Sequence, residues 1–150
     1  MIARALAALL AARERTLAAL LVGGAALLAL EIRFEHREAL GETWRSWIPL
    51  VYAVCTVAAG GAALVAWERG GRKVLLGLFA LGLLVGPAGF LLHSGGHPLR
   101  AAKEVLSAWT LAPGQGGGIE RGHPPALAPL AFAGLGALGV VVCARGGPRG

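Results

Sequence analysis

The sequence predicts an all-α fold in which a single domain, residues 1–150, forms an integral membrane four-helix bundle with a short interfacial helix in its second outer loop. Hydrophobic residues make up 56% of the chain and charged residues 15%, whereas soluble domains average about 45–50% and about 25%. The apolar residues also gather in long blocks that alternate with short charged segments. This alternation is typical of a chain that crosses a membrane several times.

Four apolar segments come close to the ~20 residues that cross a hydrocarbon core of about 30 Å. They are residues 16–32, 47–67, 74–93 and 125–143, which contain 17, 21, 20 and 19 residues. No A-x-A site closes the first segment, so we expect a retained helix rather than a cleaved signal peptide. The second segment has an aromatic residue at each end, Trp47 and Trp67.

Basic residues predict the orientation of the bundle. Four spans place both termini on one side, where residues 1–15, 68–73 and 144–150 contain eight Lys/Arg in 28 residues. Residues 33–46 and 94–124, on the other side, contain six in 45. The positive-inside rule therefore predicts a multi-pass protein of the cell (inner) membrane with both termini in the cytoplasm. The Ala, Gly, Leu and Arg bias is typical of a bacterium with GC-rich DNA.

The net charge of +6 would suit nucleic-acid binding in a soluble protein. Here the basic residues lie at the ends of apolar segments, with no basic stripe and no aromatic stacking motif. We therefore interpret them as topology signals. The expected partners are the lipid bilayer and other membrane proteins or a second copy of the chain, not nucleic acid.

Small residues recur four positions apart within the predicted spans, a spacing that lets helix backbones approach closely in a membrane. The pairs are Ala19 and Gly23, Ala25 and Ala29, Gly82 and Gly86, and Ala133 and Ala137. We expect these pairs to mark contacts between helices. Chance is the alternative, because Gly alone contributes 24 residues.

The two predicted outer segments carry patterns of their own. Residues 99–109 place Leu99, Leu106 and Trp109 on one helical face, which predicts a short helix lying on the outer membrane surface. Four glutamates near the outer end of the first span follow the spacing i, i+4, i+7 and i+11, namely Glu31, Glu35, Glu38 and Glu42. This spacing predicts that the first helix continues out of the membrane with a solvated acidic face. A stripe that binds a cation or a partner is the alternative.

All four histidines fall on the predicted outer side. His36 lies just beyond the first span, His93 ends the third and His123 precedes the fourth, so three span ends bring imidazoles to a similar depth. Imidazole is the commonest metal ligand and also a haem axial ligand. His36, His93, His123 and Glu35 are therefore candidate ligands of a haem or a transition-metal ion. Tolerated polar residues at a membrane interface are the competing interpretation.

No complete catalytic signature is present, so we assign no catalytic residue and favour a non-enzymatic protein. The sequence has no P-loop, no C-x-x-C, no H-E-x-x-H and no G-x-S-x-G, and it contains no aspartate. Two four-helix membrane families differ from the chain at their key residues. Small multidrug transporters carry a membrane-embedded Glu in the first helix, whereas Glu14 lies between Arg13 and Arg15 outside the apolar run. Quinone-reductase-like proteins need a membrane-edge C-x-x-C.

Three functions remain open. An accessory or scaffold subunit of a membrane complex agrees with the short loops, the small-residue pairs and the lack of charge deep within the spans. A haem- or metal-binding redox membrane protein would use the outer His and Glu residues. A small transporter would need several copies of the chain to form a pathway.

Overall fold

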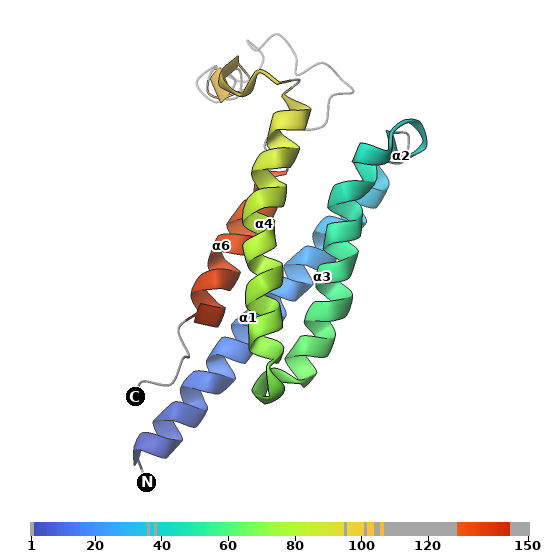
Figure 1. Ribbon diagram of the computed structural model, residues 1–150. Helices are drawn as coiled ribbons and strands as arrows, with labels where there is room; N and C mark the ends of the chain where they lie inside the picture. Colours follow the sequence, from blue (N-terminus) through green and yellow to red (C-terminus); the bar gives the residue numbers. More distant parts are fainter. Residues whose placement is uncertain are drawn as a thin grey trace, which may run out of the picture.

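The computed structural model describes residues 2–35, 37, 39–94, 96–100, 102–103, 106 and 129–144, and this part of the chain contains helices and turns but no strand. Four helices run side by side as a bundle (Figure 1). They are α1 (Ile2–Glu35), α3 (Trp47–Val65), α4 (Gly71–His93) and α6 (Leu130–Ala144). Shorter elements are α2 (Ala39–Glu42) and the 3-10 turns η1 (Trp44–Ser46) and η2 (Trp67–Arg69).

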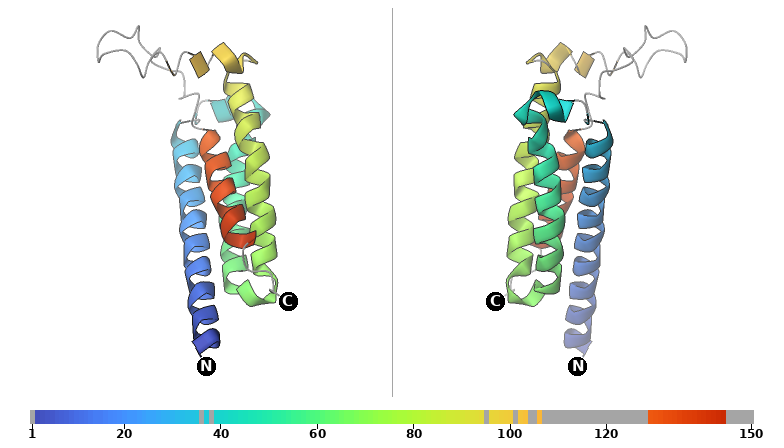
Figure 2. Two further views of the ribbon diagram at one scale, coloured as in Figure 1. Left: turned by 90° about the vertical axis from the view of Figure 1, so that its left-hand side faces the viewer. Right: turned by 90° about the vertical axis from the view of Figure 1, so that its right-hand side faces the viewer.

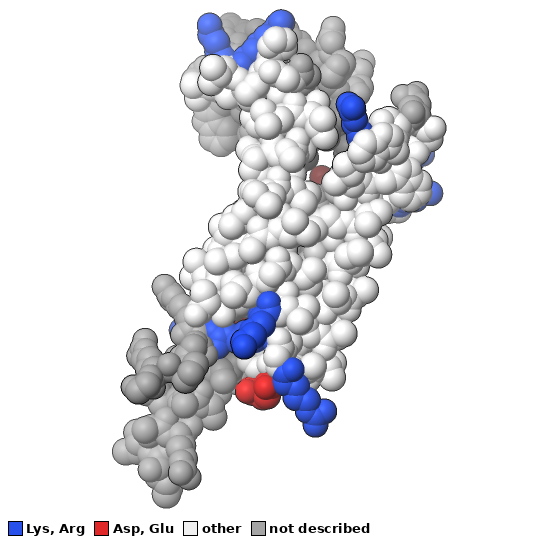
Figure 3. Space-filling model, in the orientation of Figure 1, with Lys and Arg blue, Asp and Glu red and all other residues white. Residues whose placement is uncertain are grey.

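The bundle has two distinct ends. The start of α1, the end of α3, the start of α4 and the end of α6 lie together, and we call this the N-terminal end (Figures 1 and 2). The first turns of α1 extend past the other helices there. We call the other end the opposite end. On the face drawn in Figure 3, charged side chains lie mainly toward the two ends and uncharged surface lies between them.

Three helices are long and apolar enough to cross a membrane. The stretches Ala12–Glu35, Trp44–Val65 and Gly71–Leu92 have mean hydropathies of 1.9, 2.0 and 2.3. Helix α6 is apolar but has 15 residues, a rise of about 22 Å at ~1.5 Å per residue. The predicted fourth span begins at residue 125, and residues 125–128 lie outside the described part. A membrane bundle of three long helices and one shorter helix is therefore plausible.

The turn between α3 and α4 is tighter than the sequence suggests. Helix α3 ends at Val65, not at Trp67, which lies in η2 and is buried. Gly70 follows with φ of 97°, a left-handed conformation that favours glycine. A side chain at Gly71 would overlap the carbonyl group of Ala63. Two adjacent glycines thus let α4 start directly against the end of α3.

Helices α4 and α6 pack backbone against backbone. A Cβ atom at Gly86 would lie 2.7 Å from the backbone nitrogen of Ala133, and one at Gly136 would lie 2.6 Å from the carbonyl oxygen of Phe79. Both distances are too short for a real Cβ contact, so only glycine fits. The pairing of Gly82 with Gly86 as a contact site is confirmed, whereas Gly136 and Gly139 were not predicted.

The other small-residue pairs behave differently. Ala25 is buried and Ala29 is half-buried, so this pair faces the interior. Ala19 and Gly23 are exposed, and a Cβ atom at Gly23 would meet no neighbour within 4 Å. That pair therefore makes no helix contact within the described part of the chain.

Two buried clusters fill the bundle. The cluster nearer the N-terminal end consists of Ala18, Val22, Ala63, Trp67, Leu75, Phe79 and Cys143. The cluster nearer the opposite end consists of Ile32, Leu50, Tyr52, Ala53 and Phe132. The Tyr52 hydroxyl donates a hydrogen bond of 2.9 Å to the carbonyl oxygen of Leu78, and its ring meets Phe132 edge-on at 5.2 Å. Tyr52 thus ties α3 to both α4 and α6.

Part of the segment after α4 is helical, in agreement with the predicted surface helix. Residues 98–100, 102–103 and 106 are helical and extend sideways from the end of α4 (Figures 1 and 2). Leu99 is 86% exposed and Leu106 is 64% exposed. The remaining residues of the predicted stretch, including Trp109, lie outside the described part.

Candidate functional site

The predicted metal or haem ligands are only partly within the described structure. Glu35 is the last residue of α1 and is exposed, and His93 is the last residue of α4. His36 and His123 lie outside the described residues. Within the described ranges, no three His, Cys, Asp or Glu side chains lie close enough together to hold a metal ion. The four-residue ligand set therefore stays a prediction.

The predicted acidic face does not form on one continuous helix. Helix α1 ends at Glu35, Arg37 lies in a turn, and α2 is a separate helix that ends at Glu42. The break has a physical cause, because Leu40 packs against the buried cluster at the opposite end. The indole Nε1 of Trp47 donates a hydrogen bond of 2.9 Å to the carbonyl oxygen of Leu40. These two contacts fold the chain back over the bundle instead of extending α1.

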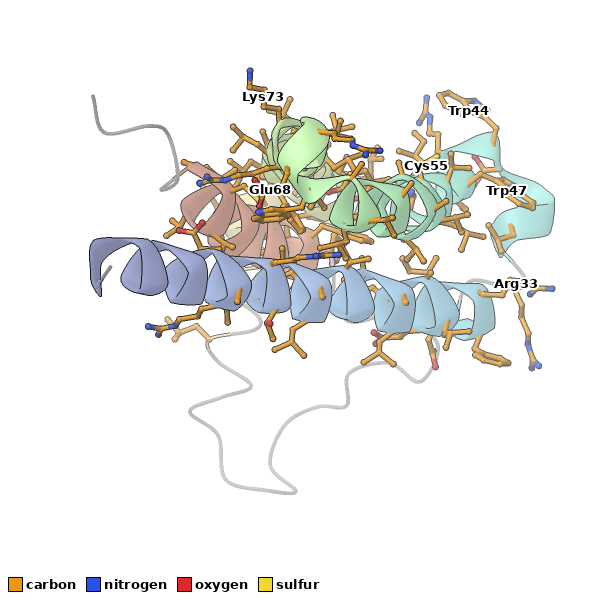
Figure 4. All side chains as sticks on the ribbon, turned by 90° about the horizontal axis from the view of Figure 1, so that it is seen from below. Arg33, Trp44, Trp47, Cys55, Glu68 and Lys73 are labelled. Carbon is orange, nitrogen blue, oxygen red and sulfur yellow. The ribbon has the colours of Figure 1, made fainter. Side chains whose placement is uncertain are left out.

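Aromatic and basic side chains are exposed at the opposite end of the bundle. Figure 4 shows Arg33, Trp44 and Trp47 together at this end, with Glu68 and Lys73 at the other. Trp44 is 72% exposed and Trp47 is 48% exposed. Tryptophans at the ends of spans are expected at membrane interfaces, where an amphipathic ring contacts both apolar and polar surroundings.

A polar cluster at the N-terminal end joins four elements of the bundle. Arg72 Nη2 of α4 lies 3.7 Å from Glu14 Oε2 of α1, and the two side chains are only 18% and 25% exposed. The guanidinium carbon of Arg72 lies 6.0 Å from the ring centre of Trp67 in η2, within the range of a cation–π contact. Cys143 of α6 belongs to the same buried cluster as Trp67. We call Glu14, Trp67, Arg72 and Cys143 the Arg72 cluster.

Helical spacing explains why Glu14 points inward while its neighbours do not. Glu14 lies four residues before Ala18, which is buried, and Val22 repeats the same spacing on the same face. Arg13 and Arg15 fall on other faces and are exposed. From the sequence alone, Glu14 lies between Arg13 and Arg15 outside the apolar run. Extending the buried face of α1 back by one turn would have found Glu14.

The Arg72 guanidinium has donors that are not satisfied by hydrogen bonds. Its Nε and Nη2 atoms are buried and have no hydrogen-bond partner within the described part of the chain. The carboxylate of Glu14 neutralises the charge, but 3.7 Å is longer than a hydrogen bond. The described side chains around Arg72 form no nucleophile–base–orienter arrangement. The cluster is thus suited to holding α1, α4 and η2 together.

The outward surface of α3 differs from those of its neighbours. After its first turn, where Trp47 and Ile48 are exposed, the exposed side chains of α3 are all small or β-branched: Val51, Val54, Cys55, Ala58, Ala59, Ala62 and Val65. We call these residues the α3 face. In contrast, α1 and α4 expose leucines, including Leu20, Leu27, Leu84 and Leu91. Both cysteines are free, and Cys55 lies on the α3 face whereas Cys143 is buried.

No family model matches the chain, and no curated protein and no solved structure matches it either.

Proposed function

We propose that this small membrane protein is a non-enzymatic accessory or scaffold subunit of a membrane complex. The α3 face is the observation that supports this function. Contacts between helices in a bilayer are enriched in small residues, because lipid tails are as apolar as leucine and close backbone packing provides the attraction. A face that only contacts lipid has no such need for small side chains.

The interior of the same bundle provides a comparison. Helix α4 meets α6 through Gly82 and Gly86, where small residues bring the backbones together. Helix α3 offers a similar set of small residues, but this set points away from the rest of the chain. A helix of another subunit would complete the packing there.

The same proposal includes a fourth span, a surface helix and the orientation of the chain in the membrane. Residues 125–128 would extend α6 to a full span, and residues 99–109 would lie as a helix on the outer membrane surface. With four spans, the positive-inside rule places the N-terminal end in the cytoplasm.

The test is a pair of matched double substitutions. Ala58→Leu with Ala62→Leu enlarges the α3 face, and Ala80→Leu with Ala88→Leu enlarges exposed positions of α4 by the same volume. The full chain is purified from native membranes in mild detergent, and the complex is sized on a native gel with stoichiometry from mass spectrometry. We expect a stoichiometric partner with the wild-type chain and the α4 variant, and its loss from the α3 variant. A lone monomer in every case would refute the proposal.

A further inference from the structure

In the sequence, the net positive charge belongs to the segments of the predicted cytoplasmic side. Residues 1–15, 68–73 and 144–150 contain eight Lys/Arg but only two acids, Glu14 and Glu68. The other six Lys/Arg are balanced by the other six glutamates, of which five lie on the predicted outer side and Glu31 lies at the outer end of the first span. The whole net charge of +6 therefore comes from the segments of the predicted cytoplasmic side.

Five of these basic side chains are described by the structure, and we call them the basic collar: Arg13, Arg15, Arg69, Arg72 and Lys73. Four of them are exposed, and Arg72 is mostly buried. On the face drawn in Figure 3, blue side chains lie toward the N-terminal end of the bundle with one small acidic patch beside them. Glu14 offsets only Arg72, so the exposed members keep an excess of positive charge.

The basic collar lies at the boundary of the apolar surface. The apolar stretches of α1 and α4 begin at Ala12 and Gly71, so each basic side chain lies within about one turn of the end of a span. Phospholipid phosphates occupy this depth in a bilayer. A topology signal alone requires positive charge on this side, but it does not require five cations grouped around the ends of the helices.

Arg72 lies at the inner margin of this group. Its Nε and Nη2 atoms are buried and have no hydrogen-bond acceptor among the described residues. Glu14 and Trp67 hold its guanidinium in place from α1 and η2. The members that a headgroup can reach are therefore the four exposed ones, Arg13, Arg15, Arg69 and Lys73.

We propose that the basic collar binds the phosphate headgroup of an anionic phospholipid. Clusters of Lys and Arg next to transmembrane helices, and basic pockets between such helices, recognise anionic lipid headgroups. A lipid fits better than a soluble acidic protein, because the cations surround the ends of spans whose apolar sides contact acyl chains. This inference does not depend on the accessory-subunit proposal.

The experiment compares lipid preference in two variants with the same change in charge. Arg69→Gln with Lys73→Gln removes two exposed cations from the basic collar, and Arg33→Gln with Arg45→Gln removes two from the opposite end. The full chain in mixed micelles receives equal amounts of phosphatidylglycerol and phosphatidylcholine, and native mass spectrometry counts the bound lipids. Circular dichroism confirms that both variants remain folded.

We expect the wild-type chain and the Arg33/Arg45 variant to prefer phosphatidylglycerol. The Arg69/Lys73 variant should lose roughly tenfold or more of that preference, the order expected for two cations near the membrane. Inorganic phosphate at tens of millimolar should not displace the lipid. Three results would overturn the proposal: no preference in the wild-type chain, equal losses in both variants, or displacement by inorganic phosphate, which would indicate a site for free phosphate.

Discussion

Breaking the ion pair between Glu14 and Arg72 should loosen the N-terminal end of the bundle. Two unit charges 3.7 Å apart attract by about 4.5 kcal/mol at an effective dielectric constant of about 20. The cost of removing both groups from water offsets much of this attraction. Substitution of one partner leaves the other charge uncompensated, which destabilises a protein by about 3–5 kcal/mol when the pair is fully buried. Because these side chains are 18% and 25% exposed, we expect about 2–3 kcal/mol for Glu14→Gln or Arg72→Gln.

Cys143 provides the assay, because its thiol is buried in the same cluster as Trp67. In a Cys55→Ala background, the rate of maleimide labelling at Cys143 reports how often this end opens. A cost of about 2 kcal/mol should raise that rate roughly thirtyfold, since each 1.4 kcal/mol is a factor of ten. Thermal unfolding of the same variants in detergent, followed by circular dichroism, gives an independent measure.

The double variant makes the reasoning refutable. Glu14→Leu with Arg72→Met replaces both charges by apolar groups of similar volume, which is often neutral or stabilising at buried pairs. Its labelling rate should therefore return to within a few-fold of the parent rate. Two results would show that the charges of Glu14 and Arg72 do not stabilise one another. In the first, both single variants label at the parent rate. In the second, the labelling rate of the double variant equals the rate expected from adding the free-energy changes of the two single variants.

Three further predictions concern the rest of the chain. Gly136→Ala should destabilise the bundle by about 1–3 kcal/mol, because the new methyl group would lie 2.6 Å from the carbonyl oxygen of Phe79. Gly134→Ala is the control, because a methyl group there would meet no neighbour within 4 Å. Equal melting temperatures of the two variants would contradict the packing of α4 against α6. Tyr52→Phe removes the hydrogen bond to α4 and should cost about 0.5–1.5 kcal/mol in the same thermal assay. If the predicted histidine and glutamate ligands form a site, the purified protein should show a Soret band or a stoichiometric metal ion; the lack of both would end that hypothesis.

The spans were predictable because lipid imposes a simple rule on sequence. A segment without water must satisfy its backbone within one helix and must keep its side chains apolar for about 20 residues. Residues 74–93 meet this rule and fall within α4, which the structure places at Gly71–His93. Gly82 and Gly86 were also found, because their spacing places them on one face wherever the helix packs.

The missed features depend on contacts between distant parts of the chain. Whether Glu14 faces inward follows from which side of α1 meets α3 and α6, and helical spacing extends that face to Glu14 only once it is known. The end of α1 at Glu35 depends on Leu40 reaching the buried cluster and on the hydrogen bond from Trp47. The spacing of the four glutamates was helical, but these tertiary contacts stabilise a turn instead.

The α3 face and the basic collar lie at different depths, so they can be tested separately. Ala58 and Ala62 lie within the span, whereas Arg69 and Lys73 lie beside its end. Leucine at Ala58 leaves apolar contact with lipid intact but pushes a neighbouring helix away, and glutamine at Lys73 weakens headgroup binding without changing the span. If the Ala58/Ala62 variant kept its partner while the Arg69/Lys73 variant lost it, the partner would be held by charge at the membrane surface, and the small residues of α3 would need another explanation.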